Sequence, residues 1–125
     1  MSSPSVTSNT YPYQNERTWT NSERTTARRV FDAALNRELH EIMQKARQKA
    51  EEIKEPADVW ELERYLTRRR KEIDRKYEFR SSQLTRVFGT LLFEHRITEE
   101  ELVGLGEDKL KAIRSCAKVL SEDAA

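Results

Sequence analysis

The sequence predicts an all-α fold: two long antiparallel helices forming an extended dimer stalk, followed by a small C-terminal helical head. Three observations lead to this prediction. The chain has only three Gly and three Pro among 125 residues, and Pro4 and Pro12 lie near its start, so helix breakers are rare elsewhere. Apolar residues recur at spacings of three, four and seven, as on one face of a helix. Two capping-box patterns mark helix starts.

The first 18 residues differ in composition from the rest of the chain. They are rich in Ser, Thr, Asn and Pro and show neither a helical nor a strand period, so residues 1–18 are expected to form a disordered N-terminal tail. Residues 19–125 are expected to form a single helical domain. Within it, residues 19–83 supply the stalk helices and residues 84–120 the head.

The first stalk helix is predicted to begin after Thr20. Thr20 and Glu23 have capping-box spacing, in which the hydroxyl accepts from the Glu23 amide and the carboxylate accepts from the Thr20 amide. The apolar stripe that follows continues to about Lys54. Pro56 then breaks the helix and is preset for the first turn of the next one. Because the connection is short, the two stalk helices are predicted to be antiparallel neighbours.

The second stalk helix is predicted as one continuous element over residues 57–95. The segment contains no Pro, and its apolar residues fall within about 40° of Leu66 on a helical wheel. They are Val59, Leu62, Leu66, Ile73, Tyr77, Leu84, Phe88 and Leu91. At ~1.5 Å per residue such a helix spans about 58 Å. A compact domain of this chain length has a diameter of roughly 35 Å, so no single globule could cover the stripe.

A second copy of the chain is the simplest cover for this stripe. The sequence therefore predicts a homodimer that buries one group of apolar residues of the second stalk helix. The predicted interface consists of Val59, Leu62, Leu66, Ile73 and Tyr77.

The C-terminal part is predicted to fold back over the apolar segment 84–93. Thr98 and Glu101 form a second capping box, which opens a short helix through Val103. Gly104 and Gly106 follow and end it. A last helix is predicted over about residues 107–120, with Ile113 and Cys116 on its apolar face.

Composition excludes several classes of protein. Charged residues make up 36% of the chain at a net charge of +1, which suits solvated helices better than a nucleic-acid binder. No apolar run reaches ~18 residues, so no membrane span is expected. No signal-peptide pattern is evident, and the single Cys116 fits a reducing compartment, so we expect a cytoplasmic protein.

Catalytic and metal-binding patterns find no support in the sequence. The two histidines, His40 and His95, have no second ligand at metal-site spacing, and no Gly-rich phosphate loop or nucleophile elbow exists. We therefore expect no enzyme activity, no metal and no cofactor. Four consecutive basic residues suggest a nucleic-acid patch: Arg68, Arg69, Arg70 and Lys71. Because consecutive residues of a helix point about 100° apart, their side chains do not share one face, and no such patch is expected.

Trp60 is the main functional indication in the chain. It sits about 120° from the apolar stripe, on a flank shared with charged residues such as Glu63. One interpretation is a packing contact where the first stalk helix turns into the second. The other is an anchor for a partner protein, because Trp and Arg dominate the energetics of protein–protein interfaces.

Several residues together resemble the fluorescence recovery protein family of cyanobacteria. The likeness is carried by Asp58-Val59-Trp60-Glu61-Leu62, Leu66, Arg70, Glu72-Ile73-Asp74 and Lys76-Tyr77, and extends from Trp19 through Asn36-Arg37-Glu38-Leu39 to Glu100-Glu101-Leu102 and Asp108-Lys109. The resemblance implies an all-helical homodimer. It also implies a non-enzymatic regulator that binds the photoactivated red form of the orange carotenoid protein. Such a regulator speeds the return to the orange form and ends non-photochemical quenching at the phycobilisome.

The resemblance also implies a partner-binding patch. Its Trp and Arg match Trp60 and Arg70, whereas Glu63 and Arg64 replace the His and Asp of the family pattern. Either recognition is retuned by this charge reversal, or the chain is a dimeric scaffold of the same family with another partner and no recovery activity. With the carotenoid protein as partner, the protein would reach the cytoplasmic face of the thylakoid membrane.

Overall fold

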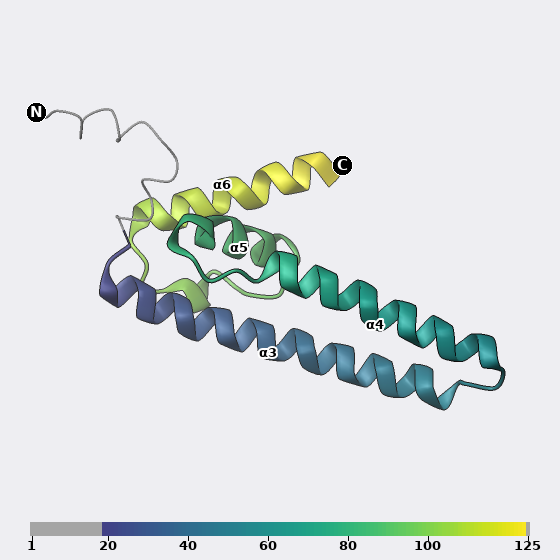
Figure 1. Ribbon diagram of the computed structural model, residues 1–125. Helices are drawn as coiled ribbons and strands as arrows, with labels where there is room; N and C mark the ends of the chain where they lie inside the picture. Colours follow the sequence, from purple (N-terminus) through teal and green to yellow (C-terminus); the bar gives the residue numbers. More distant parts are fainter. Residues whose placement is uncertain (1–18, 125) are drawn as a thin grey trace, which may run out of the picture.

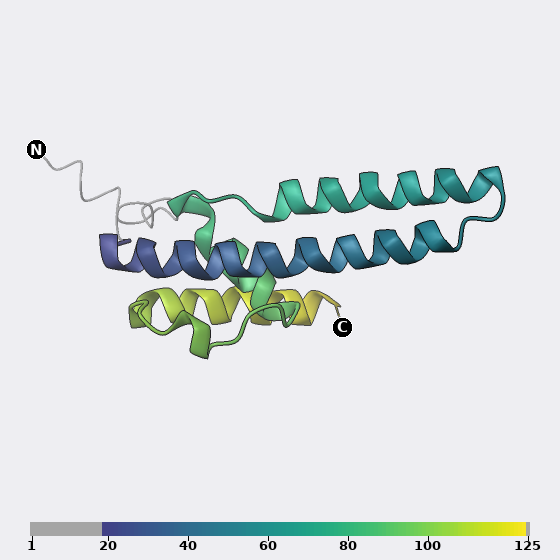
Figure 2. The same cartoon turned by 90° about the horizontal axis from the view of Figure 1, so that it is seen from below.

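The computed structural model describes residues 19–124, and these form an all-α fold. The elements in chain order are α3 (Asn21–Glu51), α4 (Pro56–Lys76), α5 (Ser81–Phe93), the 3-10 turn η2 (Glu100–Leu102) and α6 (Glu107–Ala124). Helices α3 and α4 lie side by side as an antiparallel hairpin (Figures 1 and 2). The tip of this hairpin projects away from a head made of α5, η2 and α6. The predicted fold class is therefore confirmed.

The predicted start of the first stalk helix is confirmed. The Thr20 amide donates to Glu23 Oε1 at 2.9 Å, and the Glu23 amide donates to Thr20 Oγ1 at 3.0 Å. The helix ends at Glu51, slightly before the predicted end. At the hairpin tip the Asp58 carboxylate accepts from the amides of Lys54 and Glu55, at 2.9 and 3.1 Å. These bonds close the turn that makes α3 and α4 antiparallel.

The prediction of one continuous helix over residues 57–95 is wrong. Helix α4 ends at Lys76, and Tyr77 has extended backbone angles of φ −99° and ψ 91°. The rings of Tyr77 and Phe79 both contact Phe31 edge-on, with centroids 5.4 and 5.2 Å apart. Two residues separated by one position share a face in extended chain but point about 200° apart in a helix. Burying both rings against α3 therefore requires the helix to break.

The break allows α5 to lie in the head between α3 and α6 (Figures 1 and 2). Its close neighbour is α6, and Gly89 permits this approach. A Cβ atom on Gly89 would lie 2.5 Å from Cys116 Sγ and 2.6 Å from Cys116 Cβ. The expected fold-back of the C-terminal part over residues 84–93 is thus confirmed, with Leu84 and Leu91 fully buried.

The C-terminal turn and helix follow the predicted capping pattern. The Thr98 amide donates to Glu101 Oε1 at 2.8 Å, and the Glu101 amide donates to Thr98 Oγ1 at 3.4 Å. The element that follows is a single 3-10 turn, shorter than predicted, and Gly104 ends it with a φ of 115°. Helix α6 continues to Ala124, beyond the predicted end near residue 120.

One acidic residue connects the start of α3 to the head. Glu23, which caps α3, also accepts from the Gly106 amide at 2.7 Å and pairs with Lys109 Nζ at 3.0 Å. Both side chains of this ion pair are at least nine-tenths buried. The residue identified as a helix cap therefore also docks α6 onto α3.

The hydrophobic core occupies only the head end of the molecule. Its members are Trp19, Ala27, Val30, Phe31, Ala34, Leu84, Val87, Phe88, Leu91, Ile97, Leu102, Leu105 and Ile113. Beyond Glu38 no residue of α3 is buried, and in α4 only Tyr65 is. The distal hairpin thus exposes Leu39, Met43, Val59 and Leu66. Among the described residues, no helix is long and apolar enough to cross a bilayer. The predicted tail, residues 1–18, lies outside the described residues.

Candidate partner-binding surface

Trp60 lies in the second turn of α4, close to the hairpin tip, and 60% of its surface is exposed. A Trp that packed beneath the turn would be largely covered. The turn is instead closed by Asp58, which bonds the two amides that precede Pro56. This exposure favours the interpretation of Trp60 as an anchor for a partner.

The other three predicted contact residues are exposed along the same helix. Glu63 accepts from the Thr67 hydroxyl at 2.9 Å, and neither Arg64 nor Arg70 forms an ion pair with any residue from 19 to 124. Arg70 lies about 15 Å along the helix from Trp60 and about 80° around it. The four residues therefore form an exposed ridge, and the structure does not gather them into a pocket.

The predicted dimer stripe is mostly uncovered within the single chain. Val59 and Leu66 are exposed, and Leu62 and Ile73 are half-buried. Helical geometry places them on the same side of the hairpin as the exposed Leu39 and Met43 of α3. Together they form a surface on the side of the hairpin away from the head, which we call the apolar hairpin face. It consists of Leu39, Met43, Val59, Leu62, Leu66 and Ile73. Tyr77 differs from them, because its ring packs against the hydrophobic core of the same chain.

A polar cluster around Glu38 lies where α4 meets α3, and sequence reasoning missed its role. Glu38 is 1% exposed. Its carboxylate accepts from Arg69 Nη2 at 2.8 Å, Lys76 Nζ at 2.9 Å and the Tyr77 hydroxyl at 2.7 Å, and Arg96 Nε lies 3.4 Å away. Arg69 and Lys76 are seven residues apart and so share one face of α4. That spacing could have indicated that both residues face α3. It was missed because a helix face that packs on another helix is normally recognised by apolar residues, and these two are basic.

The electrostatics of this Glu38 cluster hold the carboxylate in its charged form. Burial alone would raise the pKa of Glu38, but hydrogen bonds from Lys76 and Tyr77 and the charges of Lys76 and Arg96 lower the pKa below its ordinary value. Burial and the bond to Glu38 raise the pKa of the Tyr77 hydroxyl. The cluster is therefore a fixed ionic connection between α3, α4 and the loop after α5.

Among residues 19–124 no group of three or more His, Cys, Asp or Glu side chains could hold a metal ion. His40 is exposed on α3, and His95 is exposed in the loop after α5, with a φ of 61°. The Cys116 thiol is half-buried against Gly89, and burial raises its pKa.

Comparison with known proteins places these observations in a family. Residues 19–117 match the family described as the photoprotection regulator fluorescence recovery protein. The fluorescence recovery protein of Synechocystis sp. (strain PCC 6803) is 35% identical over 104 residues, which cover 83% of this chain and 95% of that protein. The family resemblance identified from the sequence is thereby confirmed.

Solved structures of this family have the same fold. The Fremyella diplosiphon protein superposes with a TM-score of 0.77 at 37% identity, and the Synechocystis protein with 0.77 at 35%. Each superposition covers 80% of this chain and 98% of the solved one. This chain belongs to the fluorescence recovery protein family of photoprotection regulators.

Proposed function

We propose that this protein binds the photoactivated form of the orange carotenoid protein and accelerates its reversion, thereby ending non-photochemical quenching. The observation that carries the proposal is the exposure of Trp60 at the tip of a hairpin, in a chain of this family. An aromatic side chain of this size buries a large area when a partner covers it, and its charged neighbours suit the rim of an interface.

Acceleration of a conformational change requires differential binding. The regulator must bind the transition state of the reversion more tightly than the red form, otherwise it would only sequester that form. It must also bind the red form more tightly than the orange form, so that product leaves. The Glu38 cluster holds α4 against α3, so the helix that carries Trp60 is already positioned before a partner binds, which lowers the entropic cost of binding.

We also propose that two copies associate through the apolar hairpin face. Leu39, Met43, Val59 and Leu66 are exposed in the protomer and lie together on one side of two adjacent helices. Packing two such hairpins face to face would build a four-helix bundle and remove this apolar surface from water. Trp60 lies about 120° around α4 from Leu66, so the anchor would remain accessible in the dimer.

The deciding experiment follows the red-to-orange absorbance change of photoactivated orange carotenoid protein in the dark. The wild-type chain should accelerate the change at substoichiometric concentration, and Trp60→Ala should lose roughly 2 kcal/mol or more of binding and most of the acceleration. Val119→Ala is the matched control, because Val119 is an exposed apolar residue of α6 on the head. This variant should behave as wild type.

The alternative function is that of a dimeric scaffold with another partner. The specific observation in its favour is the Arg64 position, where a basic residue replaces the acidic one of the family pattern. If wild type is inactive, the double variant Glu63→His and Arg64→Asp restores that pattern, and a gain of acceleration would assign these positions to partner choice. Inactivity of both forms toward the carotenoid protein of the same organism would leave the scaffold function.

A further inference from the structure

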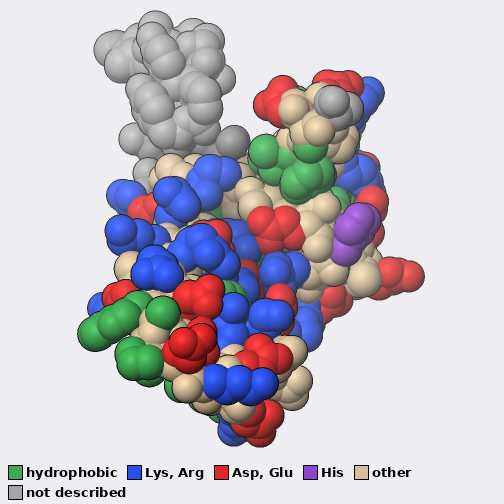
Figure 3. All heavy atoms as spheres, turned by 90° about the vertical axis from the view of Figure 1, so that its right-hand side faces the viewer, with side chains coloured by type: hydrophobic (Ala, Val, Ile, Leu, Met, Phe, Trp, Pro, Cys, Tyr) green, Lys and Arg blue, Asp and Glu red, His purple; other side chains and the backbone are tan. Residues whose placement is uncertain are grey.

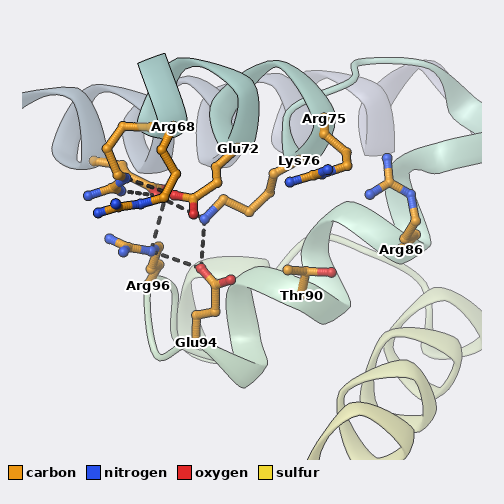
Figure 4. Close-up of a pocket in the computed structure, with 10 residues that line it drawn as sticks. Arg68, Glu72, Arg75, Lys76, Arg86, Thr90, Glu94 and Arg96 are labelled. Carbon is orange, nitrogen blue, oxygen red and sulfur yellow. Dashed lines mark hydrogen bonds and ion pairs between the residues drawn. The ribbon is translucent and has the colours of Figure 1, made fainter. Parts of the chain in front are cut away.

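A basic cleft separates α4 from α5 and lies outside the Trp60 surface. Its volume is about 560 Å³, and ten residues line it (Figure 4). Six of them are basic and three are acidic: Arg68, Arg69, Arg75, Lys76, Arg86 and Arg96 against Glu38, Glu72 and Glu94. Basic side chains are also conspicuous in the space-filling view, between the hairpin tip and the head (Figure 3).

The three acidic residues of the cleft are already paired with three of its basic residues. Arg69 and Lys76 bind Glu38, Arg69 Nε lies 2.9 Å from Glu72, and Lys76 and Arg96 contact Glu94 at 2.7 and 2.9 Å. Arg68, Arg75 and Arg86 take no part in these pairs, so their guanidinium groups can bind a ligand.

The remaining three guanidinium groups have weak or no acidic partners among residues 19–124. Arg68 lies over the Tyr65 ring at 5.5 Å, and no ion pair involves it or Arg75. Arg86 donates to Gln83 at 2.9 Å, and its nearest carboxylate, Glu78, is 3.8 Å away. Arg75 and Arg86 point into the same gap from α4 and α5 (Figure 4). This arrangement suits a ligand that carries carboxylates, because guanidinium groups bind them through paired hydrogen bonds.

The basic surface continues from the cleft toward the hairpin tip. Four residues follow one another along α4: Trp60, Arg64, Arg68 and Arg75. From each to the next, the side-chain position rotates around the helix axis by no more than about 40°. The distance from the first to the last is about 22 Å, the span of roughly seven residues of extended chain. Arg75 lies about 180° around α4 from Leu66, so this track faces away from the apolar hairpin face.

We propose that the cleft and this track bind an acidic, extended polypeptide segment of a partner protein. The length of the track exceeds what a small anion needs. Nucleic acid is a poorer fit, because acidic residues are interspersed along the cleft and would repel its phosphates. The proposal extends the contact from Trp60 and Arg64 into the cleft, and it does not depend on which protein supplies the acidic segment.

Fluorescence anisotropy with labelled octaglutamate tests the proposal on the full-length protein. Octaglutamate should bind at low salt, whereas octaglutamine should not, and Arg75→Glu combined with Arg86→Glu should weaken binding roughly tenfold or more. Arg47→Glu is the control. It makes the same charge change per site at an exposed position of α3, where Arg47 forms no ion pair with any described residue. The affinity of this variant for octaglutamate should stay within about twofold of wild type. Circular dichroism checks that each variant is folded, and Arg75→Gln with Arg86→Gln provides a milder second pair.

Competing ligands separate the alternatives. Triglutamate should bind more weakly than octaglutamate, and Arg64→Glu should weaken only the longer peptide. Equal affinity for inorganic tripolyphosphate or triglutamate would overturn the extended segment in favour of a small-anion site. Tighter binding of an eight-nucleotide oligouridylate, or equal losses in the Arg47 and the Arg75/Arg86 variants, would also overturn it. The peptide-binding measurement contains no carotenoid protein, so failure of the recovery assay would have no bearing on its result.

Discussion

The Tyr77 hydroxyl donates a hydrogen bond of 2.7 Å to Glu38 Oε1, across 39 positions of the sequence. Tyr77 is the C-cap residue that follows α4, and Glu38 is the last buried residue of α3. The bond therefore fixes the place where the hairpin meets the head. It also fixes the direction in which the chain leaves α4 toward α5.

Tyr77→Phe should destabilise the protein by about 1.5–3 kcal/mol, the range for a hydrogen bond to a charged group. The ring would still pack edge-on against Phe31, so helicity should be unchanged. Urea unfolding followed by circular dichroism measures the difference. Tyr77→Leu should cost more, because it also removes the aromatic contact. Equal stability of Tyr77→Phe and wild type would show that the bond to Glu38 contributes nothing.

Glu38→Gln should cost roughly 3 kcal/mol at pH 7, because it leaves Arg69 and Lys76 without their buried acidic partner. The pKa of Glu38 is lowered in the folded protein from an ordinary value of 4.5, so the unfolded chain binds the proton more readily. The stabilisation from Glu38 is therefore complete above about pH 4.5 and is lost as pH falls through the lower folded-state pKa.

Melting temperatures of wild type and Glu38→Gln between pH 7 and pH 3 test this dependence. The gap between the two proteins should narrow as pH falls below about 4.5. Glu122→Gln, at an exposed position of α6 without a hydrogen bond to residues 19–124, is the control and should track wild type throughout. A gap that stays constant from pH 7 to pH 3 would falsify the role of Glu38.

Leu66→Glu should convert a dimer to a monomer at micromolar concentration. A charge placed without a partner at the centre of the apolar hairpin face costs several kcal/mol when a second copy covers it. Light scattering gives the mass. Val119→Glu makes the same change at an exposed apolar position of α6 and should leave the mass of two chains unchanged. A dimeric Leu66→Glu variant would remove this face as the interface.

Gly89→Ala should destabilise the head by about 1–3 kcal/mol, the usual cost of overpacking. The added methyl group would lie 2.5 Å from Cys116 Sγ, and neither helix can move without disturbing the core between α5 and α6. A double-mutant cycle with Cys116→Gly isolates the contact. Since that substitution removes the obstructing atoms, the double variant should be less destabilised than the sum of the two single variants. Simple additivity would mean that the two residues do not constrain each other.

Local chemistry was sufficient to determine the helical class, the start of α3 and the hairpin turn. Thr20 and Glu23, and Thr98 and Glu101, form capping bonds between residues three apart, so their outcome is set by neighbours in the sequence. Pro56 likewise acts within its own turn. The family also followed from the sequence, because the matching residues extend over most of the chain.

Only the tertiary structure decided where α4 ends and which side of it faces α3. The segment around Tyr77 contains no Gly or Pro, and its helix breaks because Tyr77 and Phe79 both gain packing against Phe31, which is more than 40 positions away. The α3-facing side of α4 carries Arg69 and Lys76, which are ordinary surface residues until Glu38 is placed between them. The same holds for the basic cleft, since Arg75 and Arg86 come together only after the break turns α5 back toward α4. Contacts between residues so far apart in the chain depend on the whole fold, and no short-range pattern specifies them.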